Sequence, residues 1–312
     1  MDIGMSLFNL NYERLIQALP IMASSGAKAV EVSYLPFTAS DAQLGDLARQ
    51  YAEAGLPWRS IHAQFGDAGD IGSAIEGLRR HGVEGHKDLI RRASVVGARY
   101  IVVHPGRGVH DVSRIPGQEV STRRSLEELV PLAEEAGVVL ALENMLPQHS
   151  YEHAERQRAL VDEFNSPALR TCFDCGHAHV GEGVPHVVKA LGETIVTVHL
   201  ADNDTSSDLH LQPPYGTINW THVFQGLEAA GYRDVLTVET QPWGKARPSR
   251  LVLELQALYN TAMKIEGALP RLLRDERTGA WLRCRGCNHF WVETAEGITC
   301  ACDDEPLDYQ GV

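Results

Sequence analysis

The fold is decided by a short apolar stretch, Val138-Val139-Leu140-Ala141-Leu142-Glu143-Asn144. Its leading residues form a continuous Val/Leu run, which predicts a strand buried on both faces, as in a parallel sheet. A helix-period segment at 121–135 precedes the run, and Gly137 stands where a left-handed helix cap is expected. The stretch is therefore the second half of a helix–strand repeat, and it delivers a carboxylate, Glu143, to the end of its strand.

The same repeat recurs along the chain. Apolar runs rich in Val and Ile predict eight strands, at residues 3–8, 27–32, 58–62, 100–104, 138–143, 170–174, 195–200 and 235–239. Helical periodicity predicts segments between and after them, at 12–25, 41–53, 73–96, 121–135, 155–164, 184–191, 220–230 and 249–264. Eight repeats favour a closed barrel over an open sheet. The turn Phe8-Asn9-Leu10-Asn11 also lacks the glycines of a dinucleotide-binding loop.

Six consecutive predicted strands end in residues that can bind a metal: His62, His104, Glu143, Asp174, His199 and Glu239. Three more such residues follow in predicted loops: His177, Asp208 and His210. The C-terminal ends of barrel strands meet at one mouth, where the active sites of such enzymes lie. Carboxylates that converge there repel one another unless a cation is bound. We therefore expect a divalent metal site at this mouth. We also expect an enzyme, because a purely structural metal site would not need the open position that a barrel mouth provides.

These motifs resemble the xylose-isomerase-like barrel superfamily, in particular its sugar-phosphate isomerase/epimerase group, which is related to endonuclease IV-type apurinic endonucleases. The resemblance covers roughly residues 1–265. It rests on His62-Ala63, Val103-His104-Pro105-Gly106, Leu142-Glu143-Asn144, Phe173-Asp174-Cys175-Gly176-His177, His199-Leu200-Ala201-Asp202-Asn203, Asp208-Leu209-His210, Gly216-Thr217-Ile218-Asn219-Trp220 and Val238-Glu239.

The resemblance implies four ligands of a central divalent metal, at Glu143, Asp174, His199 and Glu239. In the endonuclease branch, His62 and His104 match ligands of a second metal that shares Glu143. A third metal there would take His177, Asp208 and His210. In single-metal epimerases, the residue at the His177 position contacts the sugar instead. One to three barrel ions are therefore expected, as zinc, manganese, cobalt or magnesium.

The expected activity is a sugar, sugar-phosphate or keto-sugar isomerase or epimerase. The metal would hold two neighbouring sugar oxygens, while Glu143 and Glu239 act as the acid/base pair through an enediolate. His177 and Trp243 are the candidate substrate contacts. Glu31, at the end of the second predicted strand, is expected to be a solvated or salt-bridged acid on the rim.

Two alternatives stay open. An endonuclease IV-like phosphodiesterase would use clustered metals to generate hydroxide, and the matching ligand positions support it. However, the loop Ala63-Gln64-Phe65-Gly66-Asp67 lacks the Tyr-and-Asn pattern of the endonucleases. The segment Glu143-Asn144-Met145-Leu146-Pro147 also lacks their small-residue continuation. A metal-dependent lyase or dehydratase on the same barrel is the second alternative.

The C-terminal segment carries two close cysteine pairs, Cys284 with Cys287 and Cys300 with Cys302. Such pairs around a short hairpin predict a structural zinc site, although the second pair has one intervening residue instead of two. His289 is a reserve ligand. The predicted organisation is a barrel at 1–268, a linker at 269–280 and a zinc-ribbon-like tail at 281–312. The predicted fold class is thus α/β, a (β/α)8 TIM barrel with a small C-terminal zinc-ribbon-like appendage.

The composition bears on partners and location. The formal net charge is −13, from 41 acidic and 28 basic residues, which disfavours a nucleic-acid partner. No stretch approaches the roughly 18 apolar residues of a membrane helix. The start Met1-Asp2-Ile3-Gly4 lacks the features of a signal peptide. We therefore expect a cytoplasmic enzyme that acts on a small sugar-like molecule away from membranes, with homodimer formation left open.

Overall fold

The computed structural model describes residues 1–33, 39–240 and 247–303. Eight parallel strands form the barrel: β1 (Ile3–Leu7), β2 (Ala29–Ser33), β3 (Trp58–His62), β4 (Tyr100–Val103), β5 (Val139–Glu143), β6 (Leu169–Asp174), β7 (Ile195–His199) and β8 (Leu236–Val238). Each strand pairs with its neighbours in chain order, and β1 pairs with β8. A parallel bridge between Leu200 and Val238 closes the remaining gap between β7 and β8. The predicted (β/α)8 barrel is confirmed.

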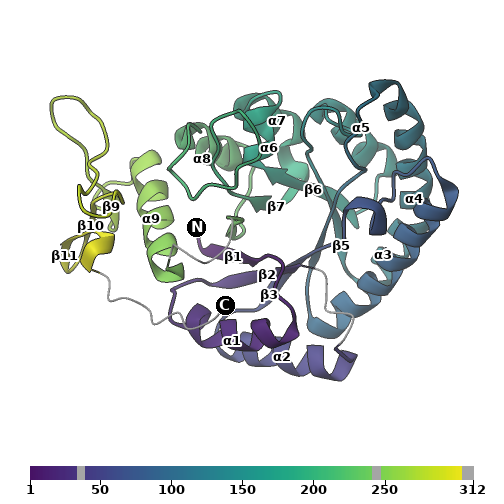
Figure 1. Cartoon of the computed structure of the whole chain (residues 1–312), viewed down its shortest axis with the longest axis horizontal. Coiled ribbons are helices and arrows are strands. Elements are labelled where there is room, and N and C mark those ends of the chain that lie inside the picture. Colours follow the sequence, from purple (N-terminus) through teal and green to yellow (C-terminus); the bar gives the residue numbers. More distant parts are fainter. Residues whose placement is uncertain (34–38, 241–246, 304–312) are drawn as a thin grey trace.

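The helices surround this barrel (Figure 1). They are α1 (Tyr12–Ala23), α2 (Asp41–Glu53), α3 (Glu76–Val96), α4 (Ile115–Ala136), α5 (Ala154–Phe164), α6 (Cys175–Val180), α7 (Val184–Leu191), α8 (Trp220–Ala229) and α9 (Pro248–Ala262). The helix α4 starts earlier than expected because Pro116 suits a first helical turn. The short α6 was not expected, and it places His177 on a helix instead of in a loop.

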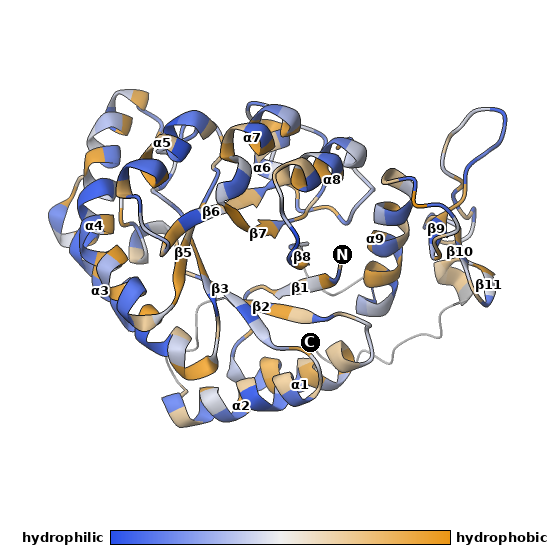
Figure 2. Cartoon of the chain, turned by 180° about the vertical axis from the view of Figure 1, so that it is seen from behind, coloured by the Kyte–Doolittle hydropathy of each residue, from blue (hydrophilic) through white to orange (hydrophobic). Residues whose placement is uncertain are grey.

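Strand alternation separates the core from the site. In β5, Leu140 and Leu142 belong to the main core, and Figure 2 shows apolar strands inside a ring of helices with hydrophilic outer faces. Ala141 points the other way and packs with Val102 and Cys172 in a small buried cluster. Because side chains alternate along a strand, Glu143 shares the face of Ala141. The Glu143 carboxylate therefore lies on the inner face of the barrel, at the C-terminal end of β5.

A small antiparallel sheet follows the barrel, in the order β11 (Gly297–Thr299), β10 (Val292–Thr294), β9 (Arg271–Leu272). It lies beside α9 (Figures 1 and 2). The strand β9 falls inside residues 269–280, which were expected to be a linker. A strand of two residues is too short to show a periodic pattern in the sequence. The boundaries between barrel, linker and tail stay a prediction.

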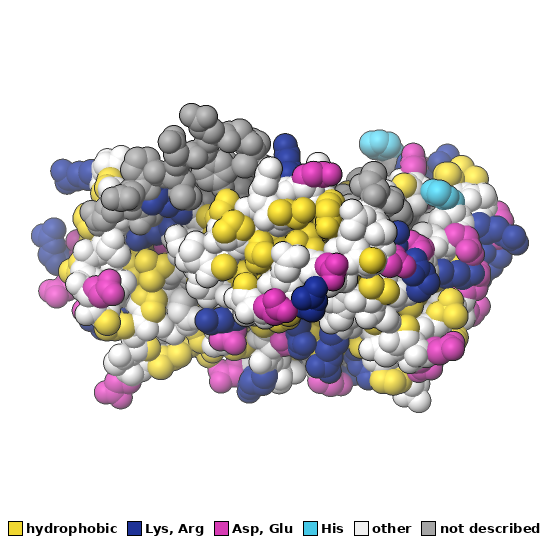
Figure 3. All heavy atoms as spheres, turned by 90° about the horizontal axis from the view of Figure 1, so that it is seen from below, with side chains coloured by type: hydrophobic (Ala, Val, Ile, Leu, Met, Phe, Trp, Pro, Cys, Tyr) yellow, Lys and Arg dark blue, Asp and Glu magenta, His cyan; other side chains and the backbone are white. Residues whose placement is uncertain are grey.

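Charged side chains of both signs are interspersed on the face that Figure 3 presents, and its described residues form no continuous basic surface. None of the described helices combines the length and the apolar composition that a membrane span requires.

The N-terminal ends of the strands hold a partly buried ion pair. Arg59 donates two hydrogen bonds to Asp234, one of them from Nε to Oδ1 at 3.2 Å, and Tyr100 donates to Oδ2 at 3.2 Å. Burial alone would raise the pKa of Asp234, but the Arg59 hydrogen bond lowers it below its usual range.

Asp234→Asn is therefore expected to lower the free energy of unfolding by about 2 kcal/mol at pH 7. A carboxyl group with a depressed folded-state pKa contributes stability above its unfolded pKa of about 3.9, and this is lost as pH falls through the folded-state pKa. The difference from wild type should consequently shrink below about pH 4. Urea unfolding at pH 7 and pH 3 measures it, and an equal loss at both values would contradict the assignment.

Candidate metal site

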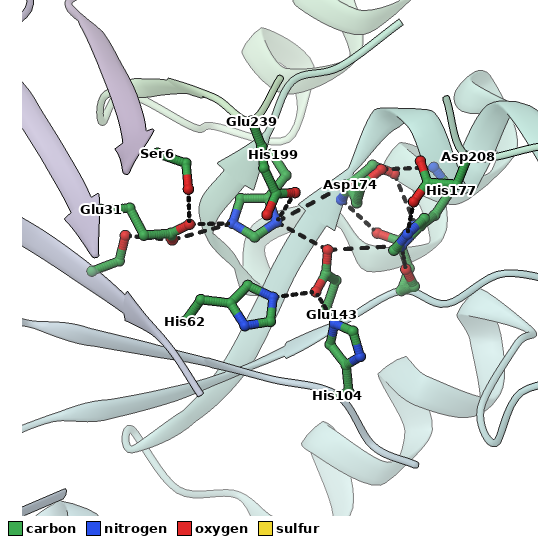
Figure 4. Close-up of polar contacts among 12 residues, drawn as sticks. Ser6, Glu31, His62, His104, Glu143, Asp174, His177, His199, Asp208 and Glu239 are labelled. Atoms are coloured by element: carbon green, nitrogen blue, oxygen red, sulfur yellow. Dashed lines mark hydrogen bonds and ion pairs between the residues drawn. The ribbon is translucent and has the colours of Figure 1, made fainter. Parts of the chain in front are cut away.

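The four predicted central ligands meet at the barrel mouth (Figure 4). Glu143 and His199 end β5 and β7, Asp174 ends β6, and Glu239 follows β8. One ligand atom from each lies within 4.8 Å of all the others, and all four residues are buried. The Nδ1 atom of His199 lies 2.9 Å from Glu143 Oε1, 3.2 Å from Glu239 Oε2 and 3.9 Å from Asp174 Oδ2. Strand ends far apart in sequence thus converge on one point.

These residues fit a divalent cation. Glu143 Oε2 and Asp174 Oδ2 are buried and accept no hydrogen bond from the described residues. Leaving a buried carboxylate oxygen without a partner costs free energy, and coordination to a metal removes that cost. Three carboxylates and one imidazole suit manganese, cobalt, magnesium or zinc. Glu143, Asp174, His199 and Glu239 would therefore hold the ion.

A second group lies on the other side of Glu143. Its Oε2 atom is 2.9 Å from His104 Nε2 and 3.5 Å from His62 Nε2. The contact with His104 is close, although it lacks the geometry of a hydrogen bond. The two oxygens of Glu143 thus face different imidazoles, so this carboxylate is placed to be shared between two ligand groups.

The third group gathers around Asp208. Its Oδ2 atom lies 3.3 Å from His177 Nε2 and 2.8 Å from His210 Nε2. The other ring nitrogens lie close to backbone carbonyls, with His177 Nδ1 2.9 Å from Asn144 O and His210 Nδ1 2.9 Å from Glu239 O. Such contacts orient both rings with Nε2 toward Asp208. All nine predicted ligand residues are therefore brought together, in three adjoining groups.

Glu31 was expected to be a solvated or salt-bridged acid on the rim, and the structure places it in the barrel interior, paired with His199. Its side chain is fully buried, and His199 Nε2 lies 3.0 Å and 3.1 Å from its two oxygens. Ser6 and Ser60 donate further hydrogen bonds to it, at 3.1 Å and 2.7 Å. Since β2 extends to Ser33, Glu31 lies deeper in the barrel than a strand ending at residue 32 suggests. Its carboxylate is placed to accept a hydrogen bond from His199 Nε2, while His199 Nδ1 faces the central group.

The two candidate acid/base residues have opposite pKa shifts. Burial raises the pKa of Glu239 to about 7. Burial would also raise the pKa of Glu143, but His199 and His104 outweigh it and hold the pKa well below its ordinary value. Neighbouring carboxyl groups whose pKa values are pushed apart are suited to opposite roles in proton transfer.

A cavity of about 270 Å³ opens beside the three groups. Glu143, His177 and Glu239 line it, together with the apolar side chains of Phe8, Phe65, Met145 and Leu146. The rings of Phe8 and Phe65 stack nearly parallel, with centroids 6.2 Å apart. This apolar wall was not predicted from the sequence. The predicted substrate contact Trp243 lies outside the described residues.

The barrel is similar to known proteins. Residues 19–258 match the model of the xylose isomerase-like TIM barrel family. The chain belongs to this family. An uncharacterized protein from Methanocaldococcus jannaschii is 32% identical over 203 residues, which cover 62% of this chain and 68% of that protein.

Other similar proteins carry names from sugar metabolism. The L-ribulose 3-epimerase of Mesorhizobium japonicum is 26% identical over 225 residues, covering 69% of this chain and 72% of that protein. The crystal structure of a D-tagatose 3-epimerase-like protein has a TM-score of 0.71 and 25% identity, covering 83% of this chain and 97% of that one. These relatives place the chain among barrels that include sugar epimerases.

Proposed function

We propose that the protein is a divalent-metal-dependent isomerase or epimerase of a sugar, sugar phosphate or keto-sugar. The observation that carries the proposal is the placement of Glu143 and Glu239. Both line the cavity, and both lie within 3.2 Å of the same His199 nitrogen. Two carboxyl groups on either side of one prospective metal position can transfer protons on opposite sides of a substrate bound there.

The chemistry divides between the cation and the chain. When bound, a divalent cation polarises a substrate carbonyl and so acidifies the neighbouring C–H bond. One of Glu143 and Glu239 then removes that proton, and the other returns a proton to the resulting enediolate. Proton transfer by positioned carboxyl groups contributes about 10²- to 10⁴-fold to the rate. His177, 5% exposed on the cavity wall, is placed to hold a substrate hydroxyl group.

The names of the relatives support a sugar substrate. The cavity also combines an apolar wall at Phe8 and Phe65 with polar groups at His177 and Asp208. A sugar presents both kinds of surface, since its C–H groups are apolar and its hydroxyl groups make hydrogen bonds.

Phosphodiester hydrolysis is the second candidate. It is favoured by the three adjoining ligand groups, because clustered metals can activate water and stabilise a leaving oxygen. The net charge of −13 gives an anionic nucleic acid little attraction. A lyase or dehydratase on the same barrel remains a further alternative within metal-dependent chemistry.

The testing experiment combines metal analysis with a substrate screen. We expect purified protein with bound divalent metal to interconvert ketoses or aldose–ketose pairs, in a reaction that a chelator stops and added manganese, cobalt, magnesium or zinc restores. Proton transfer through solvent-exchangeable carboxyl groups should also introduce deuterium from D₂O into the sugar. Cleavage of abasic DNA or simple phosphodiesters, without turnover of any sugar, would overturn the proposal in favour of the phosphodiesterase.

A further inference from the structure

The four tail cysteines form a cluster that the barrel chemistry does not use. Ligand atoms of Cys284, Cys287, Cys300 and Cys302 all lie within 4.8 Å of one another. The sulfurs of Cys284 and Cys302 are 3.6 Å apart, well beyond the roughly 2.05 Å of a disulfide. Four sulfurs each about 2.3 Å from one tetrahedral zinc ion would be about 3.8 Å apart. The cluster therefore has the size of a four-thiolate zinc site.

The surrounding backbone is built closely around these sulfurs. The Gly286 amide donates to Cys284 Sγ at 3.4 Å, and a Cβ at Gly286 would lie only 2.9 Å from Cys302 Sγ. Backbone hydrogen bonds close the turn, from Cys284 N to His289 O at 2.8 Å and from Asn288 N to Cys284 O at 2.9 Å. The turn thus approaches the sulfurs as a metal-binding knuckle does, and its last residue is His289.

This turn delivers His289 to the barrel. The Nδ1 atom of His289 lies 2.8 Å from Tyr215 Oη and 3.2 Å from Glu254 Oε1 in α9. Glu254 is fully buried and also accepts from Arg250 Nε at 2.9 Å. Arg250 in turn donates to the carbonyl of Phe290 in the tail at 2.6 Å. Tail and barrel therefore share one buried polar junction.

The junction continues into the loop between β7 and α8, residues 200–219, which carries Asp208 and His210. Gln212 Nε2 donates to Glu254 Oε2 at 2.6 Å, and Tyr215 Oη lies 3.2 Å from the same oxygen. Leu211 pairs with Asp202 through two backbone hydrogen bonds, at 2.7 Å and 2.8 Å. Glu254 thus connects the tail to Gln212 and Tyr215, which lie in the same loop as Asp208 and His210.

We propose that Cys284, Cys287, Cys300 and Cys302 bind one zinc ion, and that this zinc knuckle positions His289 against Glu254 to hold the 200–219 loop in place. His289 is then a positioning residue for Asp208 and His210. The zinc site stands independently of the proposed function, whereas the importance of the loop for turnover rests on it. Zinc content and hydrogen-exchange protection of the loop can therefore be measured without a substrate.

The metal site is tested on the full-length protein by elemental analysis and by cobalt substitution. We expect Cys284→Ser/Cys287→Ser to lose about one zinc per chain relative to wild type, while Glu296→Gln, an exposed change in the β10–β11 turn, loses none. Cobalt-loaded wild type should show thiolate-to-cobalt charge-transfer bands. Equal zinc in the double variant and wild type, or a cobalt spectrum without thiolate bands, would overturn the site. The wild-type spectrum decides the question even where the double variant does not fold.

The positioning role is tested by amide hydrogen exchange in the 200–219 loop. His289→Ala keeps all four cysteines, so it should retain zinc and yet exchange about tenfold faster in this loop, because a hydrogen-bonding partner of the buried Glu254 is lost. The Cys284→Ser/Cys287→Ser variant should show the same local change, and Glu296→Gln should match wild type. If the loop of His289→Ala exchanges at the wild-type rate, the positioning role is overturned, and the zinc ion would stabilise the tail alone.

Discussion

Glu239→Gln is expected to lower kcat for sugar interconversion by about 10²- to 10⁴-fold, with bound barrel metal retained. Glutamine keeps a carbonyl oxygen as a ligand but cannot accept and return a proton at the pH of the reaction. Glu239 is 5% exposed and lies 3.2 Å from His199 Nδ1, so the substitution conserves shape in a packed site. Initial rates and metal content of the same preparations measure the effect.

Deuterium exchange makes this prediction sharper. If Glu143 and Glu239 serve opposite sides of the substrate, Glu143 should still exchange one substrate C–H with D₂O in the Glu239→Gln variant, although inverted product forms about 10²- to 10⁴-fold more slowly. In the reciprocal variant Glu143→Gln, Glu239 should still exchange a substrate C–H on its own side, whereas exchange on the Glu143 side should be lost. Glu228→Gln, an exposed change in α8, is the matched control and should keep the wild-type rate. A wild-type kcat in Glu239→Gln with full metal content would remove Glu239 from the proton-transfer pair.

Glu31→Gln is expected to weaken binding of the barrel metal by about 10- to 100-fold. Both oxygens of Glu31 lie within 3.1 Å of His199 Nε2, so this carboxylate is placed to accept a hydrogen bond there and to leave Nδ1 for a cation. An amide at this position replaces one acceptor oxygen with a donor, which disfavours that ring state. The dissociation constant is measured by calorimetry or by competition with a metal-binding dye, on metal-free protein whose fold is checked by circular dichroism.

Ser60→Ala provides the comparison for Glu31→Gln. It removes one of the hydrogen bonds that Glu31 accepts, at 2.7 Å, but leaves the carboxylate facing His199. Its effect on the metal dissociation constant should therefore be smaller than that of Glu31→Gln. Equal affinities in wild type and Glu31→Gln would show that His199 keeps its orientation without Glu31.

The eight strands, and the shared position of the candidate ligands at the strand ends, follow from local patterns in the sequence. Continuous apolar runs such as 138–142 specify buried parallel strands through local preference and burial. Once eight such strands close into a barrel, their C-terminal ends must share one mouth. His62, Glu143 and His199 therefore meet as predicted, because topology converts their shared position at strand ends into proximity.

The depth of a side chain in the barrel, and its contacts with distant segments, depend on how the elements pack together. Glu31 became a partner of His199 because the length of β2 sets its depth in the barrel, which a run of apolar residues does not reveal. His289 reaches Tyr215 and Glu254 across long stretches of chain, and no periodicity links their positions. Patterns in sequence report neighbours along a helix or strand, whereas contacts between the tail, α9 and the 200–219 loop arise only when these elements pack together.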